Sequence, residues 1–186
     1  MIQWIRGNRR GFIPLADYPQ LYYIHPMTGA LARELRQTKP FANLEEEVFL
    51  NILRTGDALL QREVEVLRTE DLGFAQYNIL RILRGAGERG ASCGEIAERM
   101  VNRDPDLTRL LDRLEERGLV ARSRSTEDRR VVVSRITSKA RSLLEKLDAT
   151  VPEAHRKQLK HMSREQLRTL AELLVLARTP PTKPRN

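Results

Sequence analysis

The sequence is poor in the residues that build disulfide frameworks and metal centres. It contains one cysteine and three histidines in 186 residues. A lone Cys93 excludes an intramolecular disulfide and a cysteine-based zinc cluster within the chain. The histidines, His25, His155 and His161, are too scattered to predict a metal site, so we expect no metal.

Long apolar runs and catalytic motifs are also missing. No apolar run approaches the roughly 18 residues that span a bilayer, and no apolar segment follows the arginines near the N-terminus, as a secretory signal requires. We therefore expect a cytoplasmic protein that does not bind membranes. The sequence contains no glycine-rich phosphate loop, nucleophile elbow or close pair of acids, so we expect neither an enzyme nor a cofactor.

Basic residues are abundant. The 33 Lys and Arg outnumber the 25 Asp and Glu, which gives a formal net charge of +8 and a pI near 10.1. A charge of this sign and size favours a polyanionic partner, with nucleic acid the first candidate.

The two ends differ from the remainder in composition. Residues 1–42 are expected to form a flexible extension, because 1–26 combine glycines and prolines with five aromatic residues and lack helical periodicity. Two interpretations of 1–26 stay open: a docking arm with aromatic anchors, or a segment upstream of a true start at Met27. The tail 179–186 is rich in proline and basic residues, which predicts disorder.

The middle of the chain alternates helical patterns with turn signals. Capping boxes begin helices at Asn43, Ser92 and Ser163, and Thr137 is a further N-cap. The predicted helices cover 43–69, 75–84, a short segment after Ser92, about 105–117, 137–157 and 163–176. The predicted strands are 119–124 and 131–136, joined by a loop at 125–130.

The fourth predicted helix has the two faces that a DNA-reading helix needs. Asp104 is its predicted N-cap and Pro105 its first residue, and Gly118 ends it. One face carries Leu107, Leu110, Leu111 and Leu114. The predicted DNA-binding residues are Pro105, Asp106, Thr108, Arg109 and Arg113. The alternative is an ordinary solvated face with intrahelical ion pairs.

The segment after this helix is strongly basic. Between Val120 and Ser142 the net charge is +5, from Arg122, Arg124, Arg129, Arg130, Arg135, Lys139 and Arg141 against Glu127 and Asp128. A hairpin tip that carries arginine can enter the narrow minor groove beside a major-groove helix. We predict that Arg124, Asp128, Arg129 and Arg130 bind DNA, and that the Asp128 carboxylate holds the Arg130 guanidinium.

Four segments together resemble the MarR family of transcriptional regulators: QYNILRIL (76–83), GEIAERM (94–100), LTRLLDRLEERGLVAR (107–122) and EDRRVVVSRITSKARSLL (127–144). The resemblance implies a mainly α, winged-helix (α+β) fold of six helices with a two- to three-stranded β wing. It places the family domain at 43–178, with the winged helix-turn-helix at about 72–137 and dimerisation helices at 43–69 and 138–177.

The same resemblance implies a homodimeric repressor that binds a pseudo-palindromic operator in double-stranded DNA. A small phenolic or lipophilic effector would release it. The surplus of leucines in the last two predicted helices also favours a dimer, because a small winged helix does not cover them all.

Three alternative functions stay open. The winged helix is a protein-interaction module with 1–26 as its arm, or it binds nucleic acid without sequence preference. In the third alternative Cys93 makes the regulator a redox sensor, since a helix N-terminus depresses a thiol pKa.

Overall fold

The computed structural model describes residues 4–6, 12–14, 29–102, 104–125 and 128–179. The chain groups into two compact units, 1–56 and 57–186. Each is described by itself below.

The first unit contains short elements within the extension. Strands β1 (Trp4–Arg6) and β2 (Phe12–Pro14) pair antiparallel, with Trp4 opposite Pro14. Helix α1 (Ala30–Glu34) follows and buries Leu31. Regular structure in 1–42 differs from the expectation drawn from its composition. No alternating apolar pattern predicts the β1–β2 hairpin from the sequence. Helix α1 is shorter than two helical turns, which is too short to show helical periodicity. The docking-arm interpretation concerns 1–26, of which all but 4–6 and 12–14 lie outside the described residues.

Helix α2 (Leu44–Arg68) begins where the capping box predicts and contributes residues to both units. The Asn43 side chain accepts a hydrogen bond from the Glu46 backbone N–H at 2.8 Å, and the Glu46 carboxylate accepts one from the Ala42 N–H at 2.6 Å. Most of the apolar side chains of its first three turns are exposed, whereas Leu67 in its last turn is fully buried.

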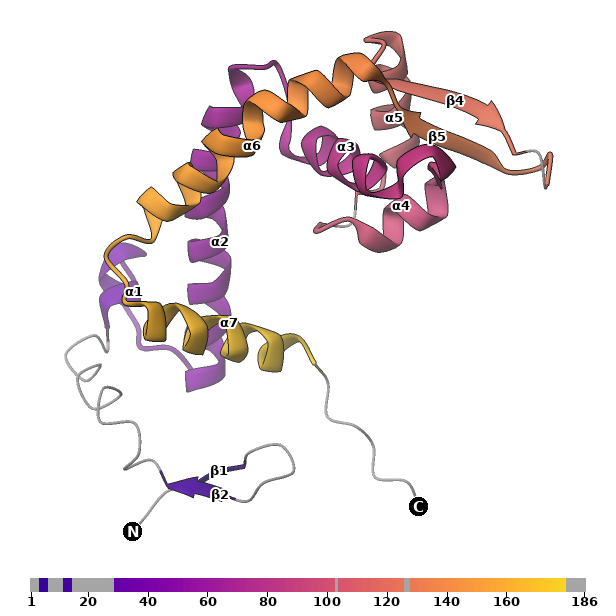
Figure 1. Cartoon of the computed structure of the whole chain (residues 1–186). Coiled ribbons are helices and arrows are strands. Elements are labelled where there is room, and N and C mark those ends of the chain that lie inside the picture. The colour runs from indigo at the N-terminus through magenta and orange to yellow at the C-terminus, as the bar shows by residue number, and fades with distance from the viewer. Residues whose placement is uncertain (1–3, 7–11, 15–28, 103, 126–127, 180–186) are drawn as a thin grey trace, which may run out of the picture. The chain divides into compact units, whose positions relative to one another are not determined.

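The second unit is a winged helix followed by two further helices (Figure 1). Its helices are α3 (Phe74–Ala86), the 3₁₀ turn η3 (Gly87–Arg89), α4 (Cys93–Arg99), α5 (Leu107–Glu116), α6 (Ser138–Gln158) and α7 (Arg164–Arg178). These bounds confirm the predicted order, and the caps at Ser92, Thr137 and Ser163 are all present. With α1, the described residues contain seven α-helices, one more than predicted.

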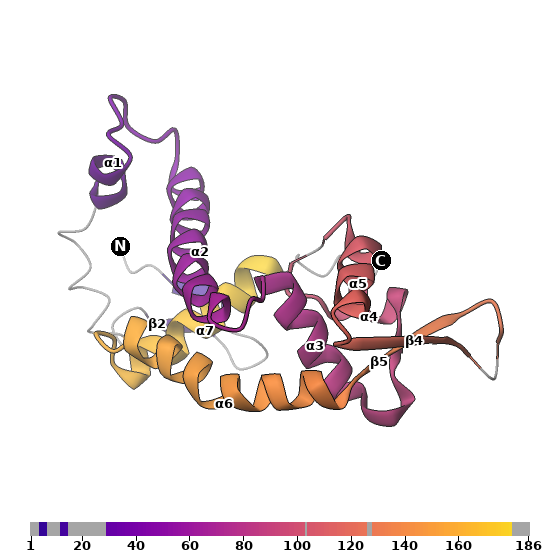
Figure 2. The ribbon, with the colours of Figure 1, turned by 90° about the horizontal axis from the view of Figure 1, so that it is seen from above.

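Three strands form a small antiparallel sheet in the order β3–β5–β4. They are β3 (Ala91–Ser92), β4 (Val120–Arg124) and β5 (Val132–Ile136). The register pairs Val120 with Ile136 and Arg124 with Val132. Figure 2 shows β4 and β5 extending as a hairpin beyond α3, α4 and α5. The sheet and helices confirm the predicted winged-helix fold.

One apolar core holds these elements in place. Its fully buried members include Leu67, Ile79, Leu80, Leu83, Ile96, Leu114, Leu119, Leu144, Leu147 and Val151. Leu144 and Leu147, which belong to the surplus of leucines in the last two predicted helices, are therefore packed within the chain. Helix α7, by contrast, has no buried residue among those described. No described helix has both the length and the apolar character to cross a membrane.

Candidate DNA-binding surface

Helix α4 and the turn after it are fixed by side-chain caps. The Ser92 hydroxyl accepts a hydrogen bond from the Glu95 N–H, and the Glu95 carboxylate accepts one from the Ser92 N–H at 2.8 Å. That backbone bond, with smaller contributions from the Ser92 hydroxyl and Arg89, lowers the pKa of Glu95. At the other end, the Asn78 side-chain oxygen on α3 accepts the Val101 N–H at 3.0 Å. The chain between α4 and α5 is thereby anchored to α3.

Helix α5 begins two residues later than predicted. Its N-cap residue is Asp106 and its first residue Leu107, so the prediction of Asp104 as N-cap is wrong. The Asp104 carboxylate instead accepts the Asp106 N–H at 2.9 Å, which forms a local turn before the helix. Asp side chains favour such turns as readily as they favour N-caps, so the Asp-Pro pattern alone does not separate the two.

The two faces of α5 are as predicted. Leu107, Leu111 and Leu114 are buried and Leu110 is partly buried. The proposed DNA-binding residues Pro105, Asp106, Thr108, Arg109 and Arg113 are all exposed. The Arg109 guanidinium lies 3.8 Å from the Asp106 carboxylate, a loose pair that leaves it available to a ligand.

A set of side-chain contacts, here called the clamp, joins α5 to the wing, and no local sequence pattern predicts it. The Arg122 guanidinium, on β4, contacts both acids on the adjacent face of α5: Nη2 lies 2.6 Å from Asp112 Oδ1 and 2.6 Å from Glu115 Oε2. The hydrogen bond to Glu115, reinforced by that to Asp112, raises the pKa of Arg122. The only sequence signal for this contact is a pair of acids three residues apart, followed by an arginine beyond the helix end. The same pattern is equally typical of a solvent-exposed helix face.

Several other wing cations also have intramolecular partners. Arg135 donates to the Glu88 carbonyl and the Ser123 hydroxyl, each at 2.8 Å, and Lys139 donates to the Arg117 carbonyl at 2.8 Å. Arg141 lies 3.6 Å from Glu88. The net charge of +5 therefore overstates the positive charge that is available to bind a polyanion, because these cations are already bonded within the winged helix.

The cations at the wing tip are different. Arg129 and Arg130 are exposed, and within the described part of the chain neither guanidinium has an ion-pair or hydrogen-bond partner. Arg124 donates to the Arg129 carbonyl at a long 3.4 Å. The Asp128 carboxylate accepts the backbone N–H of Arg130 at 2.9 Å, and no ion pair joins these two side chains. The expected carboxylate–guanidinium pair is thus wrong: Asp128 shapes the turn through the Arg130 backbone N–H and does not hold the Arg130 guanidinium.

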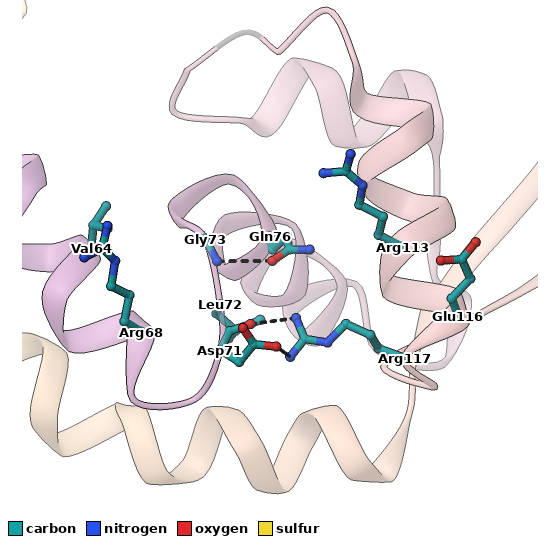
Figure 3. Close-up of a pocket in the computed structure, with 9 residues that line it drawn as sticks. All are labelled: Val64, Arg68, Asp71, Leu72, Gly73, Gln76, Arg113, Glu116 and Arg117. Atoms are coloured by element: carbon teal, nitrogen blue, oxygen red, sulfur yellow. Dashed lines mark hydrogen bonds and ion pairs between the residues drawn. The ribbon is translucent and has the colours of Figure 1, made fainter.

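A pocket of about 490 Å³ lies between α2, α3 and α5. Its residues are Val64, Arg68, Asp71, Leu72, Gly73, Gln76, Arg113, Glu116 and Arg117 (Figure 3). Arg117, at the end of α5, donates to the Asp71 carbonyl at 2.7 Å and lies 3.3 Å from its carboxylate. Asp71 occupies the left-handed region at φ 53°. The pocket is therefore joined to α5 through a contact that also holds the α2–α3 turn.

Other candidate chemistry is sparse. Cys93 is an exposed thiol at the first residue of α4. Within the described ranges, no group of three or more His, Cys, Asp or Glu residues is arranged to hold a metal ion.

Comparisons with known proteins agree with this geometry. The model of the MarR family matches residues 74–132. A solved MarR transcription factor from Planctomyces limnophilus is 39% identical, with 73% of this chain and 98% of that chain covered and a TM-score of 0.56. The HTH-type transcriptional regulator FarR of Neisseria gonorrhoeae is 26% identical over 73% of this chain and 91% of its own length. A MarR variant from E. coli complexed with operator DNA is 24% identical, with 74% and 100% covered and a TM-score of 0.66.

Proposed function

This chain belongs to the MarR family of DNA-binding transcriptional regulators, and from that premise we propose that it is a homodimeric repressor of a pseudo-palindromic operator, released by a small-molecule effector. The family is one of regulators and not of enzymes. The observation that carries the proposal is the pair of exposed guanidinium groups at the wing tip, Arg129 and Arg130, which have no partner among the described residues and lie on the same winged helix as the exposed polar face of α5.

In this proposal α5 lies in the major groove and the wing tip in the adjacent minor groove. Arg109 and Arg113 are spaced four apart on α5 and suit guanine edges, while Thr108 suits a phosphate or a thymine methyl. Pro105 and Asp106 approach the DNA at the N-terminal end of the helix. Arg130 is the proposed principal minor-groove contact, with Arg129 and Arg124 beside it and Asp128 holding the turn.

The homodimer is supported by apolar surface that the described chain does not cover. On α2 the exposed apolar residues are Leu44, Val48, Phe49, Ile52 and Leu53, and on α7 they are Leu173, Val175 and Leu176. Exposed apolar surface of this extent marks an interaction site. A twofold dimer would place two recognition helices about 34 Å apart, one DNA turn, and would therefore require a palindromic operator.

The effector is proposed to occupy the pocket beside α5, whose volume of about 490 Å³ suits a small molecule. Val64 and Leu72 offer apolar contact, while Arg68, Arg113 and Arg117 offer charge to a phenolate or carboxylate. An anion that draws Arg117 from Asp71 would free the end of the recognition helix. Because binding linkage is reciprocal, operator DNA must weaken effector binding by the same factor.

The proposal is tested by selecting duplexes from a random library with the full chain and measuring their affinity by fluorescence anisotropy. We expect a palindromic consensus and an affinity that falls steeply with salt, because phosphate contacts release counterions. Salicylate and related phenols would then be titrated into the complex, with Arg117→Ala as the matched variant. Selection without any enriched sequence would refute operator recognition. An asymmetric consensus would refute the dimeric mode.

A further inference from the structure

Arg122 occupies a position that differs from every other cation of the wing. Its side chain is only 24% exposed, and its guanidinium contacts two acids of the recognition helix at once. Nε lies 2.7 Å from Glu115 Oε2, and the Arg122 backbone N–H donates to Glu115 Oε1 at 3.2 Å. Main chain and side chain of β4 are therefore both bonded to α5.

This geometry demands an arginine. The planar guanidinium presents several donors in a fixed fork, whereas a lysine ammonium is a compact point charge on a flexible stem. Asp112 and Glu115 are three residues apart on one helix face, so their charges repel each other when no cation lies between them. The Arg122 guanidinium therefore offsets the repulsion between Asp112 and Glu115 and fixes the position of β4 relative to α5.

We propose that Arg122 is a positioning residue that sets the orientation of the wing relative to the recognition helix, and thereby determines operator specificity without contacting DNA. The inference rests on the proposed reading of an operator by α5 and the wing together. Both parts must enter adjacent grooves at the same time for specific binding. Nonspecific binding needs only phosphate contacts, so it tolerates a change in the angle between α5 and the wing.

Two other roles for Arg122 make different predictions. A cation that touches a phosphate directly contributes to binding of every duplex and to its salt dependence. A purely structural ion pair lowers the stability of the fold but affects all duplexes alike. A positioning residue instead changes the ratio between operator and unrelated DNA.

The experiment uses the full chain, the duplex enriched from the random library, and a shuffled duplex of the same length and composition. The variants are Arg122→Ala, Arg122→Lys and Glu115→Ala, with affinities measured across a range of salt and thermal midpoints measured in parallel. The matched control is Arg84→Ala. Arg84 forms a comparable bidentate pair with Asp148, but that pair joins α3 to α6 and not the recognition helix to the wing.

We expect Arg122→Ala to weaken binding of the enriched duplex about tenfold and binding of the shuffled duplex less than about twofold, with its salt slope unchanged. Arg122→Lys, which keeps the charge and folds if Arg122→Ala does not, should lose most of the same discrimination. Arg84→Ala should lower the thermal midpoint and leave the ratio of affinities intact. The double variant Arg122→Ala with Glu115→Ala should lose no more discrimination than Arg122→Ala alone, because Glu115→Ala removes a contact that Arg122→Ala already breaks.

Two results would overturn the inference. If Arg122→Ala lowers the thermal midpoint but keeps the ratio of affinities, the clamp is structural only. If it weakens both duplexes equally and reduces both salt slopes by about 1, Arg122 binds phosphate itself. Failure to enrich any duplex is a separate outcome: it refutes the proposed operator recognition, and the inference falls with it.

Discussion

The Arg84 guanidinium on α3 and the Asp148 carboxylate on α6 form a bidentate pair, with Nη1 and Nη2 each 2.8 Å from one carboxylate oxygen. Two parallel, charge-assisted bonds fix both the distance and the orientation of the groups. The hydrogen bonds that Arg84 donates to Asp148 lower the pKa of Asp148 and raise the pKa of Arg84. The pair ties the first helix of the winged helix to the helix that follows the wing.

This pair predicts a loss of stability in acid. Because the folded pKa of Asp148 lies below the unfolded value of about 3.9, its contribution is fully present above that value. It is lost as the pH falls through the folded pKa. The Asp148 side chain is 49% exposed, so solvent screening limits the contribution to about 1 kcal/mol or less. Urea unfolding of the wild type and Asp148→Asn should differ at pH 7, and the difference should shrink as the pH falls below about 3.9. A constant difference across that range would contradict the assignment.

The wing tip predicts a residue-specific loss of operator binding. Arg130→Ala should cost about 1–3 kcal/mol of operator affinity, because a groove contact is removed while the turn, held through the Arg130 backbone, persists. Fluorescence anisotropy with the enriched duplex measures this loss. Lys157→Ala, an exposed cation near the end of α6, is the control and should bind normally. Unchanged operator affinity in Arg130→Ala would remove the wing from the proposed interface.

The sequence predicted the fold well because its signals are local. Helix starts at Ser92, Thr137 and Ser163 follow from caps within one turn of chain, and the wing strands follow from an alternating β-branched run. Helix α5 likewise ends at Glu116, just before Gly118, whose φ of +67° is the one that the helix-stop signal predicts.

What the sequence did not predict depends on partners distant in the chain. Whether a wing arginine is free for DNA or held within the protein depends on where Glu88, Asp112 and Glu115 lie in three dimensions. A count of charges along the sequence does not distinguish Arg122 from Arg130. In the structure Arg122 is bonded to α5, whereas Arg130 has no side-chain partner among the described residues. The contact between Arg117 and Asp71, which are 46 residues apart, is hidden from local patterns for the same reason.

The exposed apolar surface of α2 predicts the effect of one charge on assembly. Phe49 is 60% exposed, and in the proposed dimer Phe49→Glu would bury a carboxylate without a partner, which is costly. We expect this variant to sediment as a monomer at concentrations where the wild type is a dimer, and to bind the enriched duplex more weakly. Val101→Glu, on a residue 70% exposed between α4 and α5, should keep the dimer. Monomeric wild-type protein, or a dimeric Phe49→Glu variant, would contradict the proposed interface.

Close packing between Gly90 and β5 predicts a large loss of stability from a single methyl group. Gly90 has φ +69°, and a Cβ atom there would lie 2.5 Å from the Ser134 carbonyl oxygen and 2.7 Å from Arg135 Cγ. With ψ −163° this is a backbone conformation that is essentially restricted to glycine and costs another residue about 1–3 kcal/mol, and overlap with backbone adds a similar amount. Gly90→Ala should therefore lower the free energy of unfolding by about 3 kcal/mol or more.

Gly118→Ala separates these two costs. Gly118 has a nearly identical φ of +67°, but a Cβ atom there would meet nothing within 4 Å. We expect this variant to lose only the conformational contribution, about 1–2 kcal/mol in urea unfolding. Equal losses in the two variants would mean that β5 moves away from residue 90 at little cost. A larger loss in Gly90→Ala would show that the approach of Gly90 to β5 is rigid, as a wing anchored through β3 requires.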